Sequence, residues 1–170
     1  MPRNLSAPLA VLLLSCALAT TAGAAEVLAF KVNLNPSEWR AHQSQTKQVR
    51  TTEFVRASET FDAWTERITW VTMLKKGSVR DLVNSVRAQM MMECPGMEWT
   101  IIRESKTAVL YEWKVAGCRL IPDQHELATF LDGKESRFGV HYTTKRSQLD
   151  TEPSRSTWLD VISAARVVDR

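Results

Sequence analysis

The residues of this chain best placed for chemistry are His125, Asp123 and Glu126, which form the one place where a histidine and carboxylates lie together along the sequence. A histidine beside a carboxylate can act as a general acid or base, provided that it lies in a cleft with a substrate-binding group opposite. We expect these residues in the first turn of a short helix over residues 122–131, where a solvated histidine is the favoured interpretation. They are therefore candidates, and we predict no catalytic residue.

The other two histidines are weaker candidates for a functional role. His141 falls in an expected strand, on the face opposite the aromatic residues of that strand. It either faces solvent or lies under a helix, and we favour the first. His42 lies in a polar region and is expected to be solvated. The sequence has no Gly-x-Ser-x-Gly, His-Glu-x-x-His or phosphate-binding loop. The scattered histidines form no zinc pattern with the cysteines, so we expect no metal site and no cofactor.

The N-terminus has the features of a secretory signal peptide over residues 1–24. Arg3 supplies a positive charge, and residues 9–18 form an apolar core that is too short to span a bilayer. Small residues at positions 22–24 suit a signal peptidase, so we predict cleavage after Ala24. Export of this kind would place the protein in the periplasm or outside the cell.

A second interpretation of the leader takes residues 13–16 as a lipoprotein cleavage box. Cys16 would then carry lipid and anchor the protein to a membrane. We favour plain secretion, because the apolar run before Cys16 is short. Residues 25–170 then form a single exported domain, which is long enough to bury a core.

Cys94 and Cys118 are the cysteines that remain after cleavage. An even pair in an oxidising compartment predicts one disulfide, which should stabilise the fold by roughly 3–4 kcal/mol. The alternatives are a redox pair or metal ligands. The absence of a Cys-x-x-Cys motif argues against both.

Composition excludes some classes of function. The formal net charge of the full chain is only +3, and no basic run is long enough to indicate a nucleic-acid surface. No stretch after the leader is long and apolar enough to cross a membrane. The run Met90, Met91 and Met92 is read as core packing, because methionine at helical spacing usually fills a core.

The cysteines flank a predicted β-hairpin with strands at residues 99–103 and 108–115 and a polar turn between them. A turn centred on Lys106 pairs residues whose numbers sum to a constant. The resulting register is Trp99 with Trp113, Ile101 with Tyr111, and Arg103 with Val109. It also brings Cys94 and Cys118 close enough to bridge.

A helix over residues 79–93 is predicted from apolar residues on one stripe, with Ser78 and Asp81 resembling a capping box and Pro95 preventing continuation. A closing helix is expected near residues 156–168. Residues 37–39 either begin a short helix or continue a loop. Further strands are expected at residues 27–32, 49–56, 64–73 and 137–145, and the polar strand 49–56 is expected at an exposed sheet edge.

These elements predict an α+β fold with a mainly antiparallel sheet, flanking helices and one disulfide-clasped hairpin. Residues 59–69, in which an acidic residue and a Trp-Thr-Glu run lead into a strand, resemble the start of small secreted Mog1/PsbP-like domains. Residues 94–99 and 122–127 are also similar to uncharacterised bacterial secreted proteins of that kind. The resemblance implies a non-catalytic accessory or binding module, and it carries over no catalytic residue.

We therefore expect a non-enzymatic exported protein that binds an envelope protein, an interpretation that the six tryptophans favour because aromatic residues are enriched at interfaces. One alternative is a periplasmic inhibitor or immunity protein for a hydrolase, which a projecting turn near residues 104–107 would favour. Another is a small secreted hydrolase that uses His125 or His141 with Asp123 or Glu126.

The leader and the disulfide can be tested together by the intact mass of the natively exported protein. We expect a chain that begins at Ala25 and has lost two hydrogens at Cys94 and Cys118. A lipid mass on Cys16 would select the lipoprotein interpretation. Two free thiols, or a retained leader, would contradict export into an oxidising compartment.

Overall fold

The computed structural model describes residues 25–32, 34–145 and 154–170, so the predicted leader and Cys16 lie outside the described residues. The elements, in chain order, are β1 (Glu26–Ala29), β2 (Trp39–Gln45), β3 (Val49–Arg56), β4 (Glu66–Leu74), α1 (Val79–Glu93), β5 (Glu98–Glu104), β6 (Ala108–Val115), β7 (Gln124–Asp132), β8 (Ser136–Thr144), α2 (Ser154–Ser163) and β9 (Arg166–Asp169).

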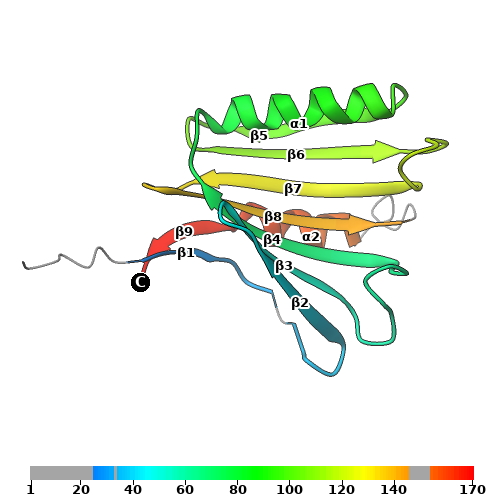
Figure 1. The fold of residues 1–170 in the computed structure, drawn as a ribbon, viewed down its shortest axis with the longest axis horizontal. Helices are drawn as coiled ribbons and strands as arrows, with labels where there is room; N and C mark the ends of the chain where they lie inside the picture. The colour runs from blue at the N-terminus through cyan, green and yellow to red at the C-terminus, as the bar shows by residue number, and fades with distance from the viewer. Residues whose placement is uncertain (1–24, 33, 146–153) are drawn as a thin grey trace, which may run out of the picture.

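Seven strands of the described residues form one antiparallel sheet in the order β2-β3-β4-β8-β7-β6-β5 (Figure 1). Strands β1 and β9, from the two ends of the described chain, pair separately as an antiparallel ribbon. The structure is thus mainly an antiparallel sheet with flanking helices. The predicted fold class holds in this sense, although the sheet dominates.

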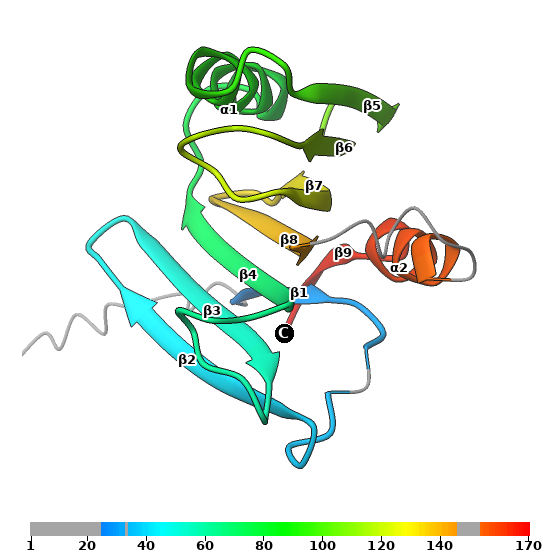
Figure 2. The same cartoon turned by 90° about the vertical axis from the view of Figure 1, so that its right-hand side faces the viewer.

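The two helices lie on opposite faces of the sheet (Figure 2). Helix α1 packs on a core that includes Val83, Tyr111 and Phe130. Helix α2 packs on a second core, which includes Ile162, Leu127 and Tyr142. Strand β7 contributes to both cores and contacts both helices, so its side chains are buried on both faces. No helix of the described residues is long and apolar enough to span a membrane.

The structure confirms helix α1 at its predicted bounds. The Ser78 hydroxyl accepts a hydrogen bond from the backbone N–H of Asp81, whose side chain returns a bond to the backbone of Ser78. This reciprocal pair satisfies two N–H groups that the first helical turn leaves free. The expected apolar stripe is buried at Val79 and Val83.

The predicted hairpin is confirmed as β5 and β6, with Trp99 opposite Trp113 and Ile101 opposite Tyr111. The prediction for Arg103 was wrong, because the register shifts after Ile101 and Arg103 lies opposite Leu110. An extra residue in one strand of an antiparallel pair makes such a bulge, which alternation along the sequence does not reveal.

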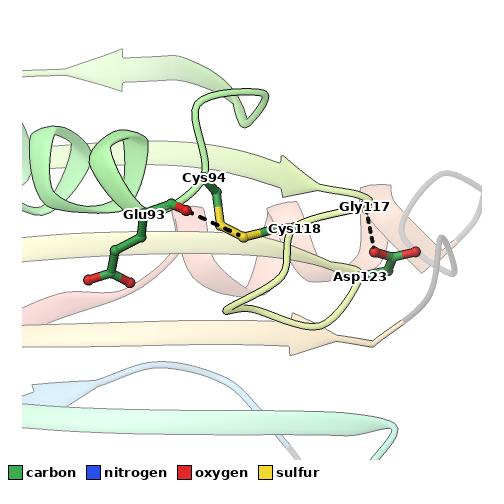
Figure 3. Close-up of a disulfide and its surroundings, with 5 residues drawn as sticks. All are labelled: Glu93, Cys94, Gly117, Cys118 and Asp123. Carbon is green, nitrogen blue, oxygen red and sulfur yellow. Dashed lines mark hydrogen bonds between the residues drawn. A yellow bond between two sulfur atoms is a disulfide. The ribbon is translucent and has the colours of Figure 1, made fainter.

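The disulfide between Cys94 and Cys118 is present, with a Cα–Cα distance of 5.6 Å. It joins the residue after α1 to the β6–β7 connection (Figure 3). In that connection the Asp123 carboxylate accepts a 2.7 Å hydrogen bond from the backbone N–H of Gly117. The bridge thus ties the end of α1 to the sheet that it covers.

The helix predicted at residues 122–131 was wrong, since this segment is strand β7. Asp123 and Glu126 resembled the capping residues of a helix, but they have other roles. The Asp123 carboxylate accepts a hydrogen bond from Gly117, and Glu126 is buried in the sheet. A strand that is covered on both faces has no apolar–polar alternation. Its sequence is therefore ambiguous between a short helix and a strand.

The closing helix was predicted too long. Helix α2 ends at Ser163, and Val167 and Val168 lie in β9, opposite Leu28 and Val27 of β1. Valine favours strands when a pairing partner is present, and this partner comes from the opposite end of the described chain.

Strand β2 was not predicted, because six of its seven residues are exposed and its sequence is polar. It pairs with β3 and displaces β3 from the edge position that the sequence analysis gave it. The other expected strands are confirmed as β1, β3, β4 and β8, with β1 shorter than predicted.

Replacement of both cysteines by alanine should lower the free energy of unfolding by roughly 3–4 kcal/mol, because the bridge closes a loop with a sequence separation of 24. Urea unfolding with and without reductant measures this. Reduced wild type should match Cys94→Ala/Cys118→Ala, and the variant should not respond to reductant. Equal stability of oxidised and reduced wild type would contradict the assigned role of the bridge.

Candidate functional site

The three candidate residues do not form one cluster. Because successive residues of a strand point to opposite faces, His125 lies on the α2 face and Glu126 on the α1 face. Asp123 is exposed in the connection before β7. The candidate acid–base group of His125 with Asp123 and Glu126 is therefore not assembled.

Glu126 is instead the centre of a polar cluster on the α1 face. Its carboxylate accepts hydrogen bonds from Trp113 Nε1 at 3.0 Å and from Thr143 Oγ1 at 2.8 Å. Its third partner is His141 Nδ1, at 3.0 Å. The expectation that His141 faces solvent was wrong, since its side chain is only 16% exposed.

Burial raises the pKa of Glu126, but attraction to His141 and the hydrogen bonds of the cluster outweigh it and leave the pKa below its ordinary value. The other ring nitrogen of His141, Nε2, is buried and has no hydrogen-bond partner among the described residues. It is packed near Phe130 and Gly139, where an added Cβ would lie 3.0 Å from it. A substrate has little access to a base in this position.

His125 has a different carboxylate partner. Its Nε2 lies 2.6 Å from Glu112 Oε1, and its side chain is buried at 3% exposure. The Arg155 guanidinium of α2 donates to both oxygens of Glu112, at 3.0 and 2.8 Å. Burial raises the pKa of Glu112, but hydrogen bonds from Arg155 and His125 outweigh it and lower that pKa overall. This group attaches α2 to β6 and β7.

Both clusters thus contain a histidine–carboxylate pair, but each pair is enclosed. General acid–base catalysis needs contact with a substrate in a cleft. Their hydrogen bonds are what buried polar side chains require, and they support a structural role. The residues that the structure describes contain no group of three or more potential metal ligands.

The exposed edge of the sheet offers a second kind of site. Thr46 N donates a hydrogen bond to Val49 O at one end of the β2–β3 ladder, and Ala57 N donates to Glu38 O at the other end. These bonds show that the even-numbered residues of β2 form the hydrogen-bonded pairs with β3. Hydrogen-bonded pairs alternate along an antiparallel ladder. The backbone groups of Ala41, Gln43 and Gln45 therefore point away from β3.

This β2 edge, defined as residues 39–45, is exposed from Arg40 to Gln45 and contains no proline or bulge. Strand β2, its hairpin turn and the first half of β3 carry three basic and no acidic side chains, namely Arg40, Lys47 and Arg50. An unpaired, regular edge is able to accept another strand. The polar composition of this region was a sequence signal for an exposed edge, but we assigned that edge to the neighbouring strand β3.

No protein-family model and no curated protein matches the chain. The resemblance to Mog1/PsbP-like domains therefore stays a prediction.

Replacement of Glu126 by alanine should lower the free energy of unfolding by about 3 kcal/mol, because two buried donors and one partly buried donor lose their acceptor. Chemical denaturation at neutral pH measures this. Glu98→Ala is the matched control, since Glu98 is an exposed strand residue and should change stability by no more than about 0.5 kcal/mol.

The effect of Glu126 should also depend on pH. The pKa of Glu126 is lower in the folded protein than its ordinary value of 4.5. The carboxylate therefore contributes its full stabilisation above pH 4.5, and this stabilisation is lost as the pH falls through the folded-state pKa. The stability difference between wild type and Glu126→Ala should therefore narrow in acid. A difference that widens in acid would show that Glu126 is protonated in the folded protein.

Proposed function

We propose that this protein is a non-enzymatic exported binding module that pairs its β2 edge with an extended, acidic segment of an envelope protein. The single observation that carries the proposal is the outward row of backbone groups on β2, at Ala41, Gln43 and Gln45. Strand addition uses such a row to bind a peptide main chain, and flanking side chains supply selectivity.

Charge supports an acidic partner. The nearest acidic side chains of the hairpin are engaged, with Glu38 3.9 Å from Arg56 and Glu53 3.3 Å from Arg67. Arg40 and Lys47 have no ion-pair partner among the described residues. Pairing of two copies through this edge would bring like charges together, which disfavours self-association.

The opposite edge of the sheet is less suited to strand addition. Strand β5 has a bulge after Ile101, and it carries the charged residues Glu98, Arg103 and Glu104. Bulges and charges are ordinary means by which a protein protects an edge from another strand. The contrast between the two edges supports β2 as the docking edge.

Among the alternatives, an inhibitor that acts through a projecting β5–β6 turn has less support. That turn is compact, because Ser105 N donates to Ala108 O at 2.8 Å and the Ser105 hydroxyl accepts from Ala108 N at 3.0 Å. A secreted hydrolase is also less well supported, because His125 and His141 are enclosed.

The experiment titrates the folded protein with a short peptide of alternating glutamate and valine, monitored by amide NMR shifts. We expect the largest shifts at Ala41, Gln43 and Gln45. Ala41→Pro removes an outward N–H and should weaken binding about fivefold, which corresponds to the net value of one hydrogen bond of about 1 kcal/mol.

Ala41→Thr is the matched control, because it alters the same side chain and keeps the N–H, so its affinity should equal that of wild type. Lys47→Glu should weaken binding of the acidic peptide and strengthen binding of a lysine–valine peptide of the same length. Equal binding of both peptides to wild type, or shifts centred on β5, would overturn the proposal.

A further inference from the structure

A cavity of about 590 Å³ lies on the α2 face, between the β1–β9 ribbon and strands β2, β3 and β4. The cross-strand pairs Gln43–Thr52 and Arg50–Thr72 place their side chains on its floor. Small-molecule sites in proteins usually measure about 300–1,000 Å³. The cavity is therefore large enough for an organic ligand.

One wall of the cavity is aromatic and aliphatic. Phe30 meets Trp70 edge-on, with ring centroids 4.9 Å apart, and the Phe54 ring is tilted against Trp70, with centroids 4.5 Å apart. Leu28 of β1 lines the same space as Phe30. These contacts fix the Trp70 ring and leave an apolar surface for the body of a ligand.

The polar lining is rich in donors. Gln43, Thr52 and Thr72 contribute polar side chains to it. Arg50 and Arg170 also line the cavity, and within the described part of the chain neither guanidinium has a carboxylate partner.

We infer that this cavity binds a small organic anion, a carboxylate with an apolar aliphatic or aromatic body. Arg50 binds the carboxylate, since guanidinium groups pair with carboxylates through parallel hydrogen bonds. Phe30 and Trp70 pack against the apolar body. The inference does not rest on strand addition at the β2 edge.

The observations favour this ligand over two others. A cationic ligand would face Arg50 and Arg170, and the lining residues include no aspartate or glutamate. Inorganic phosphate would pair with the arginines but would leave the wall formed by Leu28, Phe30 and Trp70 exposed to water. A molecule with an anionic head and an apolar body matches both parts of the lining.

The test uses residues 25–170 with the disulfide intact and three probes, namely 4-phenylbutyrate, 4-phenylbutylamine and inorganic phosphate. NMR spectra follow the Trp70 indole N–H resonance, assigned with Trp70→Phe, during each titration. We expect 4-phenylbutyrate to shift this resonance with saturation below about 10 mM, and the amine to leave it unmoved. Phosphate should bind at least about tenfold more weakly than 4-phenylbutyrate.

Arg50→Gln should weaken the binding of 4-phenylbutyrate by at least about tenfold, because the substitution removes the charged partner of the carboxylate. Lys47→Gln is the matched control: it removes one positive charge from the same hairpin but lies outside the cavity lining, and it should bind as wild type does. An unchanged amide spectrum away from the cavity shows that each variant is folded.

Three results would overturn the inference: equal binding of the amine, equal affinity of Arg50→Gln and wild type, or no saturable shift with any probe. Failure of this inference can be distinguished from failure of strand addition at the β2 edge. Ala41→Pro alters the outward backbone of β2 and should leave 4-phenylbutyrate binding unchanged.

Discussion

The burial of β7 on both faces is the constraint on which the rest of this structure depends. Residues 125–130 of β7 are buried between the two helices, so each polar side chain among them needs a partner inside the protein. His125 and Glu126 are adjacent in sequence and point to opposite cores, and each meets this requirement separately. Their two clusters attach α2 to the sheet on one face and join β6, β7 and β8 on the other.

The same constraint explains why histidine–carboxylate pairs are poor guides to activity here. Glu126 accepts three hydrogen bonds, and Glu112 is bound by both His125 and Arg155. A carboxylate satisfied in this way holds its histidine in place and is shielded from substrate. The two binding surfaces that we propose lie elsewhere, at the β2 edge, where backbone groups point outward, and beneath the β1–β9 ribbon, where two arginines line a cavity.

These two proposed binding surfaces occupy the same end of the sheet. Gln43 is part of the outward row of β2 and also lines the cavity, and Arg50 lies on the next strand. The disulfide is at the other end of the sheet order, where it ties α1 to the β6–β7 connection. A disulfide and a buried core thus accompany the α1 end of the sheet, and exposed polar groups accompany the β2 end.

The sequence by itself determined the elements whose causes are local. Helix α1 has an apolar stripe, a capping box and a terminating proline, and the β5–β6 hairpin has alternating strands around a polar turn. The pairing of Cys94 with Cys118 followed from that hairpin and from their being the two cysteines outside the leader. Each signal lies within about 25 residues of chain, so no distant partner is needed to interpret it.

Only the tertiary structure decided what depends on distant partners. Strand β7 resembled a helix because burial on both faces removes the alternation that marks a strand, and β9 became a strand because β1 lies beside it. Of the candidate site, sequence reasoning identified His125, Glu126 and His141 but not their partners, because Glu112, Arg155 and Thr143 are brought close by sheet register and helix docking. The cavity at Trp70 was invisible for the same reason, since its walls come from the two ends of the described chain and from three strands between them.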